Sequence, residues 1–182
     1  MSSPLEVVHQ DLLKLPRPVI NIFGVVDQDM YIAVRDFMST LISRGSPPLQ
    51  LRIDSGGGSV SAGLDIYDLI RLYDNEVEGI VLARAASMAA VILQACTKRK
   101  CARHGAVLIH HVSSSSVKLD VLREKKARDA LIADMERDQQ RLYAILAKKT
   151  GQKITRIKAA CKEERFMTAE EALAFKLIDE IV

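Results

Sequence analysis

A serine set among small residues is the part of this sequence best suited to covalent chemistry. Ser87 lies in the Ala-Ala-Ser-Met-Ala-Ala segment 85–90, directly after an apolar run that predicts a strand. Three glycines at 56–58 offer backbone N–H groups unobstructed by Cβ atoms, and such donors stabilise the oxyanion that forms when a serine attacks a carbonyl. His110, at the end of the apolar run 107–110, is a candidate base. These residue types together indicate acyl transfer by an activated serine.

The elements that must position these residues alternate between strands and helices. Asp27 to Asp29 supply capping oxygens for the first helix, which the Gly-Ser-Pro-Pro segment 45–48 ends. The glycine turn and Ser87 both fall where a strand passes into a helix. This alternation predicts an α/β fold with right-handed crossovers, in which sheet-end loops carry the chemistry. The predicted elements are strands at 19–25, 49–53 and 77–82, helices to about residue 43 and at 60–73, and a helix that carries Ser87 to about residue 96.

The second half of the chain is dominated by one long, charged segment. Residues 117–149 predict a single helix of about 50 Å, too long to lie wholly on a body of 182 residues. The remaining predictions are a stop at Gly151, a helix at 154–161, a capping box of Thr168 and Glu171, and a strand at 177–182.

Other polar residues have simpler interpretations. The Lys-Arg-Lys run 98–100 predicts a solvated turn. His104 lies beside Gly105 in a predicted hairpin turn, and His9 lies in the N-terminal segment, so both are expected at the surface. His111 is expected to point away from His110 if both are on a strand.

Four blocks of the chain occur in an order and with a spacing that match a known family. They are Ser55–Asp68 with its three glycines, Ala85–Ala90, Leu108–His110 and Arg165–Ala172. Together they resemble the Clp protease proteolytic subunit, the ClpP family, from about Val19 to Val182. The resemblance implies an α/β fold of the ClpP/crotonase type with repeated β-β-α units in a spiral. It also implies a single peptidase domain at 19–182 after a variable segment 1–18, with a protruding handle helix at about 117–149.

The resemblance assigns roles to individual residues. It implies that Ser87 is the nucleophile and His110 its general base. The oxyanion hole would consist of the backbone N–H groups of Gly57 and Met88. No metal ion and no organic cofactor are expected.

The chain departs from the family at the triad acid. The family has an aspartate before an Arg-Phe pair, and here Glu164 precedes that pair. A glutamate can orient an imidazole, but its additional methylene displaces the carboxylate unless the backbone retreats. Asp179 is a second candidate, although its place before the final strand is more typical of a surface residue. The family's proline at position 56 is a glycine, and the serine tract 113–116 replaces a glycine-rich segment.

The resemblance implies a serine-type endopeptidase that hydrolyses unfolded polypeptides through an acyl-enzyme, inside a homo-oligomer of two stacked heptameric rings. In the family an ATP-dependent unfoldase docks on the ring; a stand-alone peptidase is the alternative. Three other functions stay open. They are a catalytically impaired ClpP-like scaffold subunit, a crotonase-type acyl-CoA enzyme, and a peptidase that pairs serine with lysine, for which only the run 98–100 offers a lysine.

Composition and charge exclude several other classes of function. The chain has 182 residues, 48% of them hydrophobic, and a net charge of +3 from interspersed acids and bases, so no basic surface for nucleic acid is expected. No stretch reaches the roughly 18 to 20 apolar residues of a membrane span and no signal peptide is found, which predicts a cytoplasmic protein without membrane contact. Three cysteines without a CxxC pair indicate reduced thiols, and the four histidines share no metal-ligand spacing with them.

Overall fold

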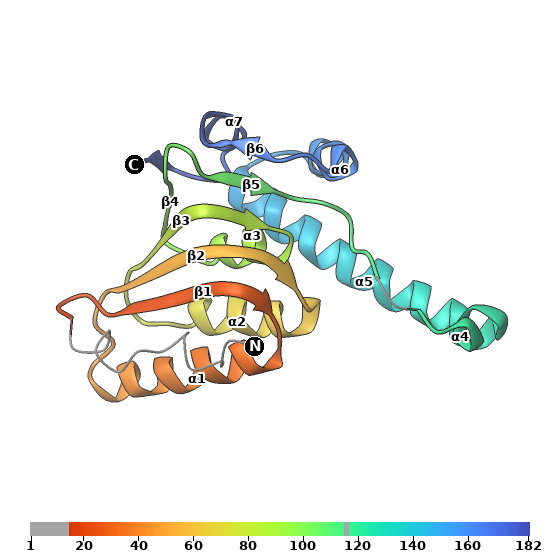
Figure 1. Cartoon of the computed structure of the whole chain (residues 1–182), viewed down its shortest axis with the longest axis horizontal. Coiled ribbons are helices and arrows are strands. Elements are labelled where there is room, and N and C mark those ends of the chain that lie inside the picture. The colour runs from red at the N-terminus through yellow and green to blue at the C-terminus, as the bar shows by residue number, and fades with distance from the viewer. Residues whose placement is uncertain (1–14, 115–116) are drawn as a thin grey trace. The chain divides into compact units, whose positions relative to one another are not determined.

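The described chain forms two compact units in a computed structural model that covers residues 15–114 and 117–182 (Figure 1). The first unit comprises the residues up to Ile109 together with Arg165–Val182, and the second is His110–Glu164. Residues 1–14, which include His9 and most of the predicted variable segment, lie outside the described residues, as do Ser115 and Ser116 of the serine tract.

A parallel sheet forms the centre of the first unit. The strands and helices of the first unit are β1 (Val19–Val26), α1 (Gln28–Ser43), β2 (Leu49–Gly58), α2 (Val60–Arg71), β3 (Val77–Ala86), α3 (Met88–Leu93), β4 (Lys98–Cys101), β5 (Ala106–Leu108), β6 (Met167–Thr168), α7 (Ala169–Phe175) and β7 (Glu180–Ile181). The strand order is β1-β2-β3-β4-β7, and each neighbouring pair is parallel. β4 pairs with the first half of β3, and β5 pairs with the last residues of β3, also in the parallel sense. β6 pairs with β5 in the antiparallel sense. This confirms the predicted α/β class.

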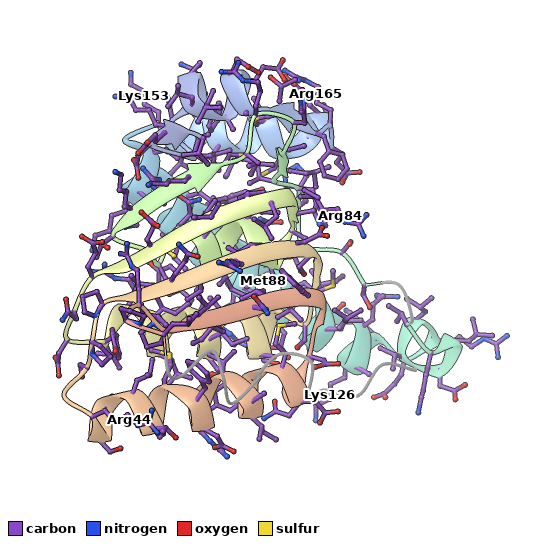
Figure 2. All side chains as sticks on the ribbon, turned by 60° about the vertical axis from the view of Figure 1, so that its left-hand side comes forward. Arg44, Arg84, Met88, Lys126, Lys153 and Arg165 are labelled. Carbon is purple, nitrogen blue, oxygen red and sulfur yellow. The ribbon has the colours of Figure 1, made fainter. Side chains whose placement is uncertain are left out.

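One face of the sheet is packed against helices. Leu49, Leu51 and Ile53 alternate along β2 and are fully buried, whereas Arg52 between them is exposed. Successive side chains of a strand point to opposite faces, so the apolar face of β2 contributes to the core and its other face is polar. Figure 1 shows α2 and α3 in a layer against the sheet, and Figure 2 shows apolar side chains filling that layer.

Helix starts follow the predicted capping residues. Asp27 Oδ1 accepts the N–H of Met30 at 2.9 Å at the start of α1. Thr168 and Glu171 form the predicted capping box of α7, because each side chain accepts the backbone N–H of the other residue. These predictions are confirmed. Such caps can be predicted from sequence because both partners of each bond lie within four residues of one another.

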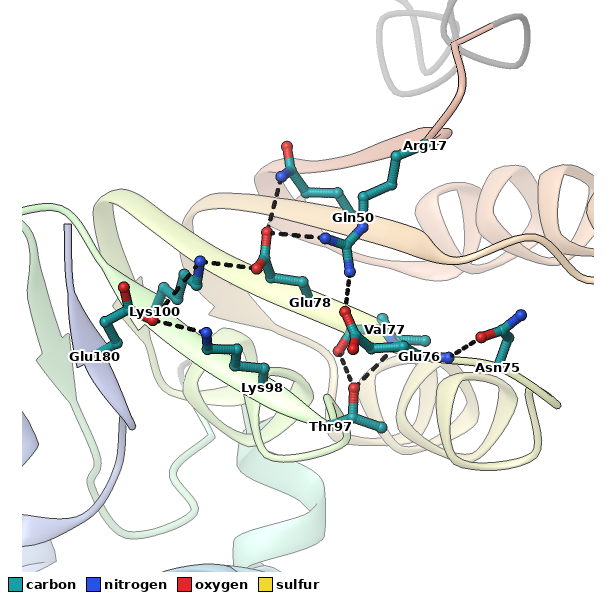
Figure 3. Close-up of polar contacts among 10 residues, drawn as sticks. All are labelled: Arg17, Gln50, Asn75, Glu76, Val77, Glu78, Thr97, Lys98, Lys100 and Glu180. Atoms are coloured by element: carbon teal, nitrogen blue, oxygen red, sulfur yellow. Dashed lines mark hydrogen bonds and ion pairs between the residues drawn. The ribbon is translucent and has the colours of Figure 1, made fainter.

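A charge network crosses the polar face of the sheet around Glu78 (Figure 3). The carboxylate of Glu78 accepts from Lys100 Nζ at 2.9 Å and from Gln50 Nε2 at 3.1 Å, and Arg17 Nη1 lies 3.5 Å away. Burial by itself raises the pKa of Glu78, but the hydrogen bonds from Lys100 and Gln50 and the charge of Arg17 outweigh it and hold the pKa below its ordinary value. Glu78 is therefore an ionised, paired carboxylate within the sheet.

The run Lys98–Lys100 is part of strand β4, so its prediction as a solvated turn is wrong. Lys98 Nζ pairs with Glu180 at 2.9 Å. Arg99 is only 7% exposed; its guanidinium binds both carboxylate oxygens of Asp179, and its Nη1 donates to Gln94 Oε1 at 2.6 Å. Acidic partners from distant segments neutralise these cations, which allows the run to lie within the sheet.

The turn that carries His104 also differs from its prediction. His104 is exposed in a turn closed by the Gly105 N–H, which donates to the Ala102 carbonyl oxygen at 2.7 Å. The surface position of His104 is confirmed. The turn is not a hairpin, because β4 and β5 on either side of it both run parallel to β3.

In its described residues, the second unit contains three helices, α4 (Leu119–Arg123), α5 (Lys125–Thr150) and α6 (Ile154–Glu163). The helix predicted at 117–149 is thus divided at Glu124, whose backbone is extended with φ −85° and ψ 114°. α4 buries no residue, so packing does not enforce helical continuity across Glu124. Gly151 ends α5 in the left-handed conformation with φ +68°, as predicted.

Candidate active site

Ser87 occupies a strained turn between β3 and α3. It lies at the N-cap position with φ +56° and ψ −125°, one residue before the helix that was predicted to contain it. A capping serine normally has an extended backbone and accepts a helix N–H, but the Ser87 side chain makes no such bond. Strain of this kind costs about 1 to 3 kcal/mol and clusters at active sites. The turn therefore presents a serine hydroxyl that is not used for capping.

The backbone around Ser87 is held from two sides. Its N–H donates to the Leu108 carbonyl oxygen at 2.9 Å, and its own carbonyl oxygen accepts the Ala90 N–H at 3.0 Å. The first bond connects the end of β3 to the end of β5, and the second belongs to the first turn of α3. These restraints maintain the unfavourable φ of Ser87.

Gly57 packs directly on this turn. Its φ is +91°, and a Cβ there would lie 2.6 Å from Ser87 Cβ and 2.9 Å from Met88 N. Gly58 has φ +154°, and a Cβ on it would meet the Val26 carbonyl oxygen at 2.2 Å. Both positions require glycine, whereas Gly56 has open space around it. The structure thus brings together Gly57, Ser87 and Met88, three of the residues singled out in the sequence.

The two predicted oxyanion-hole amides differ in their hydrogen bonding. The Gly57 N–H donates to Ser55 Oγ at 3.0 Å, and that buried hydroxyl donates to the Gly24 carbonyl oxygen at 2.6 Å. Met88 is the first residue of α3, where an N–H has no acceptor within the helix. Met88 is buried. Of these two amides, the Met88 N–H is therefore the one without an acceptor in its own helix, and its role in an oxyanion hole stays a prediction.

His110 follows β5 and is the first residue of the second unit. β5 ends at Leu108, so His110 and His111 are in irregular structure and the strand alternation expected of them does not apply. His110 is half-buried, and its side chain makes no hydrogen bond within the described residues. The next residue, His111, contacts Tyr143 of α5, with Nδ1 2.6 Å from the hydroxyl oxygen. The pairing of His110 with Ser87 stays a prediction.

The two candidate acids have different surroundings. Glu164 is the exposed C-cap of α6, with a left-handed backbone at φ +47°, and no hydrogen bond of its carboxylate is found in the described part of the chain. Asp179 binds Arg99 through both carboxylate oxygens and also accepts the Arg99 backbone N–H at 2.8 Å. Asp179 therefore has a structural role, and the role of Glu164 beside His110 stays a prediction.

The cysteines offer no competing nucleophile. All three cysteines are buried, and burial raises the pKa of the Cys101 and Cys161 thiols to about 11. Across residues 15–114 and 117–182 there is no group of three or more side chains suited to hold a metal ion. No helix in the same residues is long and apolar enough to cross a lipid bilayer.

Comparison with known proteins decides the family. The family model of the Clp protease matches residues 8–182. The chain belongs to the Clp protease family. It is 35% identical to the ATP-dependent Clp protease proteolytic subunit 2 of Chlamydia trachomatis serovars D and A, and 36% identical to that of Chlamydia muridarum, over 136 residues in each case. The matched part covers 74% of this chain and 64% of each relative, which is less than two thirds of the relatives' length.

Two contacts near the Clp protease motifs escaped the sequence reasoning. Tyr143 and Gln139 of α5 hold the residues that follow His110, the first through His111 and the second through the Val112 N–H. Both lie about 30 residues further along the chain, in a segment whose only visible signal was a thin apolar pattern. Such non-local polar contacts leave no periodicity by which to find them.

Proposed function

We propose that this chain is a serine-type endopeptidase of the Clp protease family, with Ser87 as its nucleophile. The observation that carries the proposal is the strained turn at Ser87, whose hydroxyl caps nothing and whose backbone packs on Gly57. A strained strand-to-helix turn that exposes a serine hydroxyl is also how unrelated hydrolases present their nucleophile. The names of the Chlamydia relatives, which describe a proteolytic subunit, support the same activity.

The proposed reaction proceeds through an acyl-enzyme. Ser87 Oγ attacks the carbonyl carbon of a peptide bond while His110 accepts its proton. The C–N bond then breaks, and His110 returns the proton to the leaving amine. Water attacks the resulting ester with His110 again as the base, which releases the acid product and restores Ser87. Glu164 is proposed to orient His110 and to stabilise its charge.

The oxyanion of each tetrahedral intermediate is proposed to bind the Met88 and Gly57 amides. Removal of one such donor typically lowers the rate about 100- to 1,000-fold. The Gly57 N–H donates to Ser55 in the structure, so it must exchange or share that bond when substrate binds. Gly57 has a second contribution, because its missing side chain permits the close approach of Ser87 and Met88.

The proposed substrate and assembly are supported by membership of the family. We propose unfolded polypeptides as substrates, two stacked heptameric rings as the assembly, and an ATP-dependent unfoldase as a partner in the cytoplasm. The words "ATP-dependent" and "subunit" in the relatives' names support the last two points. No nucleic acid or membrane takes part in this proposal.

A catalytically impaired scaffold subunit is the second candidate, and one observation favours it. The proposed triad acid, Glu164, lies exposed at the end of α6 without a hydrogen-bond partner in the segments that the structure covers. A crotonase-type acyl-CoA enzyme is a weaker alternative, since it would use the glycine turn and the Met88 amide without needing a serine hydroxyl at Ser87.

Covalent labelling distinguishes these functions. The protein is treated with a fluorophosphonate, and its intact mass is measured together with its assembly mass by size-exclusion chromatography. A peptidase gains one adduct per chain, and Ser87→Ala gains none. The matched control Ser59→Ala labels like wild type, because the Ser59 hydroxyl bonds only at the start of α2, to the Ala62 N–H and the Ser61 hydroxyl. Glu164→Gln labels more slowly if Glu164 orients the base. An assembled wild type that stays unlabelled refutes the peptidase and favours the scaffold.

A further inference from the structure

The segment after His110 is fastened to α5 by two hydrogen bonds. The Tyr143 hydroxyl oxygen lies 2.6 Å from His111 Nδ1, and the two rings meet edge to face with centroids 6.0 Å apart. Gln139 Oε1 accepts the Val112 N–H at 2.5 Å. Tyr143 and Gln139 are four residues apart, so they lie on the same face of α5. One helical face therefore holds both residues that directly follow His110.

Tyr143 is itself firmly placed. Its side chain is 4% exposed, and Lys158 Nζ of α6 lies 5.4 Å from the centre of its ring. Burial, together with the neighbouring Cys161, raises the pKa of Tyr143, so its hydroxyl remains protonated near neutral pH. A phenol donates to a neutral imidazole and accepts from a protonated one, so the contact with His111 persists in either state of that ring.

His110 has few restraints apart from the fastening of His111 and Val112 to α5. It lies beyond the end of β5, and its imidazole makes no hydrogen bond with any described residue. Its chain is fixed on the N-terminal side by the pairing of Leu108 with Ala86, and on the C-terminal side by the bonds to Tyr143 and Gln139. Loss of either side would leave the imidazole free to shift.

We propose that Tyr143 is a positioning residue: its hydroxyl, bound to His111, sets the place of the His110 imidazole. This inference rests on the proposed role of His110 as the general base. A displacement of about 1 Å in a reacting group costs up to roughly 100-fold in rate, and Gln139 would still restrain the segment. Loss of the Tyr143 hydroxyl is therefore expected to lower kcat about tenfold, with KM unchanged within about twofold.

The test compares two tyrosine-to-phenylalanine variants in the assembled protein. Tyr143→Phe removes the hydroxyl and keeps the ring. Tyr73→Phe is the matched control, because the Tyr73 hydroxyl also makes a partly buried bond, to the Pro47 carbonyl oxygen at 2.7 Å. His111→Asn replaces the imidazole by a side-chain amide near the position of Nδ1, which keeps a hydrogen-bond partner for the Tyr143 hydroxyl.

Two readouts are taken on each variant. The first is kcat and KM for a short fluorogenic peptide. The second is the rate at which diethyl pyrocarbonate modifies His110, measured by peptide mass spectrometry against the exposed His104 as internal reference. The second readout does not require catalysis, so it reports on the position of His110 even in an inactive protein.

The inference is supported if Tyr143→Phe lowers kcat about tenfold and accelerates His110 modification several-fold, while Tyr73→Phe and His111→Asn match wild type. It is overturned if Tyr143→Phe and Tyr73→Phe behave alike in both readouts. If wild type has no peptidase activity but His110 modification still responds only to Tyr143→Phe, the proposed function fails and the positioning role of Tyr143 stands.

Discussion

Gly57→Ala tests the core of the proposed site. The added methyl would lie 2.6 Å from Ser87 Cβ, 2.7 Å from the Ala86 carbonyl oxygen and 2.9 Å from Met88 N. None of these atoms is the end of a flexible side chain, so the backbone of the Ser87 turn must move. The variant should consequently disturb the nucleophile and the Met88 amide at the same time.

The change in the free energy of unfolding of Gly57→Ala has two destabilising contributions and one that partly offsets them. Overpacking of this kind costs about 1 to 3 kcal/mol, and the left-handed φ of +91° costs an alanine about 1 to 2 kcal/mol more. A reduced entropy of the unfolded chain returns at most about 1 kcal/mol. The free energy of unfolding should fall by roughly 1 to 5 kcal/mol, which corresponds to a lower Tm by about 2 to 20 °C for a chain of this size.

The assay measures Tm at a fixed protomer concentration and the fluorophosphonate labelling rate well below that Tm. Gly56→Ala is the matched control, because no atom lies within 4 Å of the added methyl and its φ is not left-handed. We expect Gly57→Ala to label at least about 100-fold more slowly than wild type and Gly56→Ala to label normally. If Gly57→Ala has the same Tm and the same labelling rate as wild type, the packing argument is refuted.

Three further predictions concern charge and strain. Because the folded pKa of Glu78 is depressed, its contribution to stability is present above about pH 5 and is lost as the pH falls through the folded value. Urea unfolding should therefore show a steeper loss of stability between about pH 5 and 3 in wild type than in Glu78→Gln, and equal slopes would contradict the pairing. Asp179→Asn removes the charge and one acceptor oxygen from the partly buried pair with Arg99 and should lower the free energy of unfolding by about 1 to 3 kcal/mol, without slowing Ser87 labelling of the folded protein; slower labelling would make Asp179 the triad acid instead. Ser87→Gly relieves the φ of +56° and should be about 1 kcal/mol more stable than Ser87→Ala, which keeps the strain, and equal Tm values would show that the turn is relaxed.

The strands and helices of the first unit could be predicted wherever their signals were local. Apolar runs gave β1 and the start of β2, and Asp27 and Thr168 marked helix starts by residue type alone. β4 was missed, because a strand of lysine and arginine lies in a sheet only when partners such as Asp179, 80 residues away, neutralise it. The break at Glu124 also had no local signal, since neither proline nor glycine lies there.

The candidate site shows the same limit more sharply, because Ser59 and Ser87 share a residue type and a local context. Each follows a strand and precedes a helix. Ser59 has φ −60° and ψ 127° and caps α2, whereas Ser87 has φ +56° and ψ −125° and caps nothing. The difference comes from contacts distant in sequence, the Leu108 carbonyl oxygen that accepts the Ser87 N–H and the bare backbone of Gly57 against the turn. Local rules would make both serines caps, so the failure of the rule at Ser87 is itself the structural argument for chemistry there.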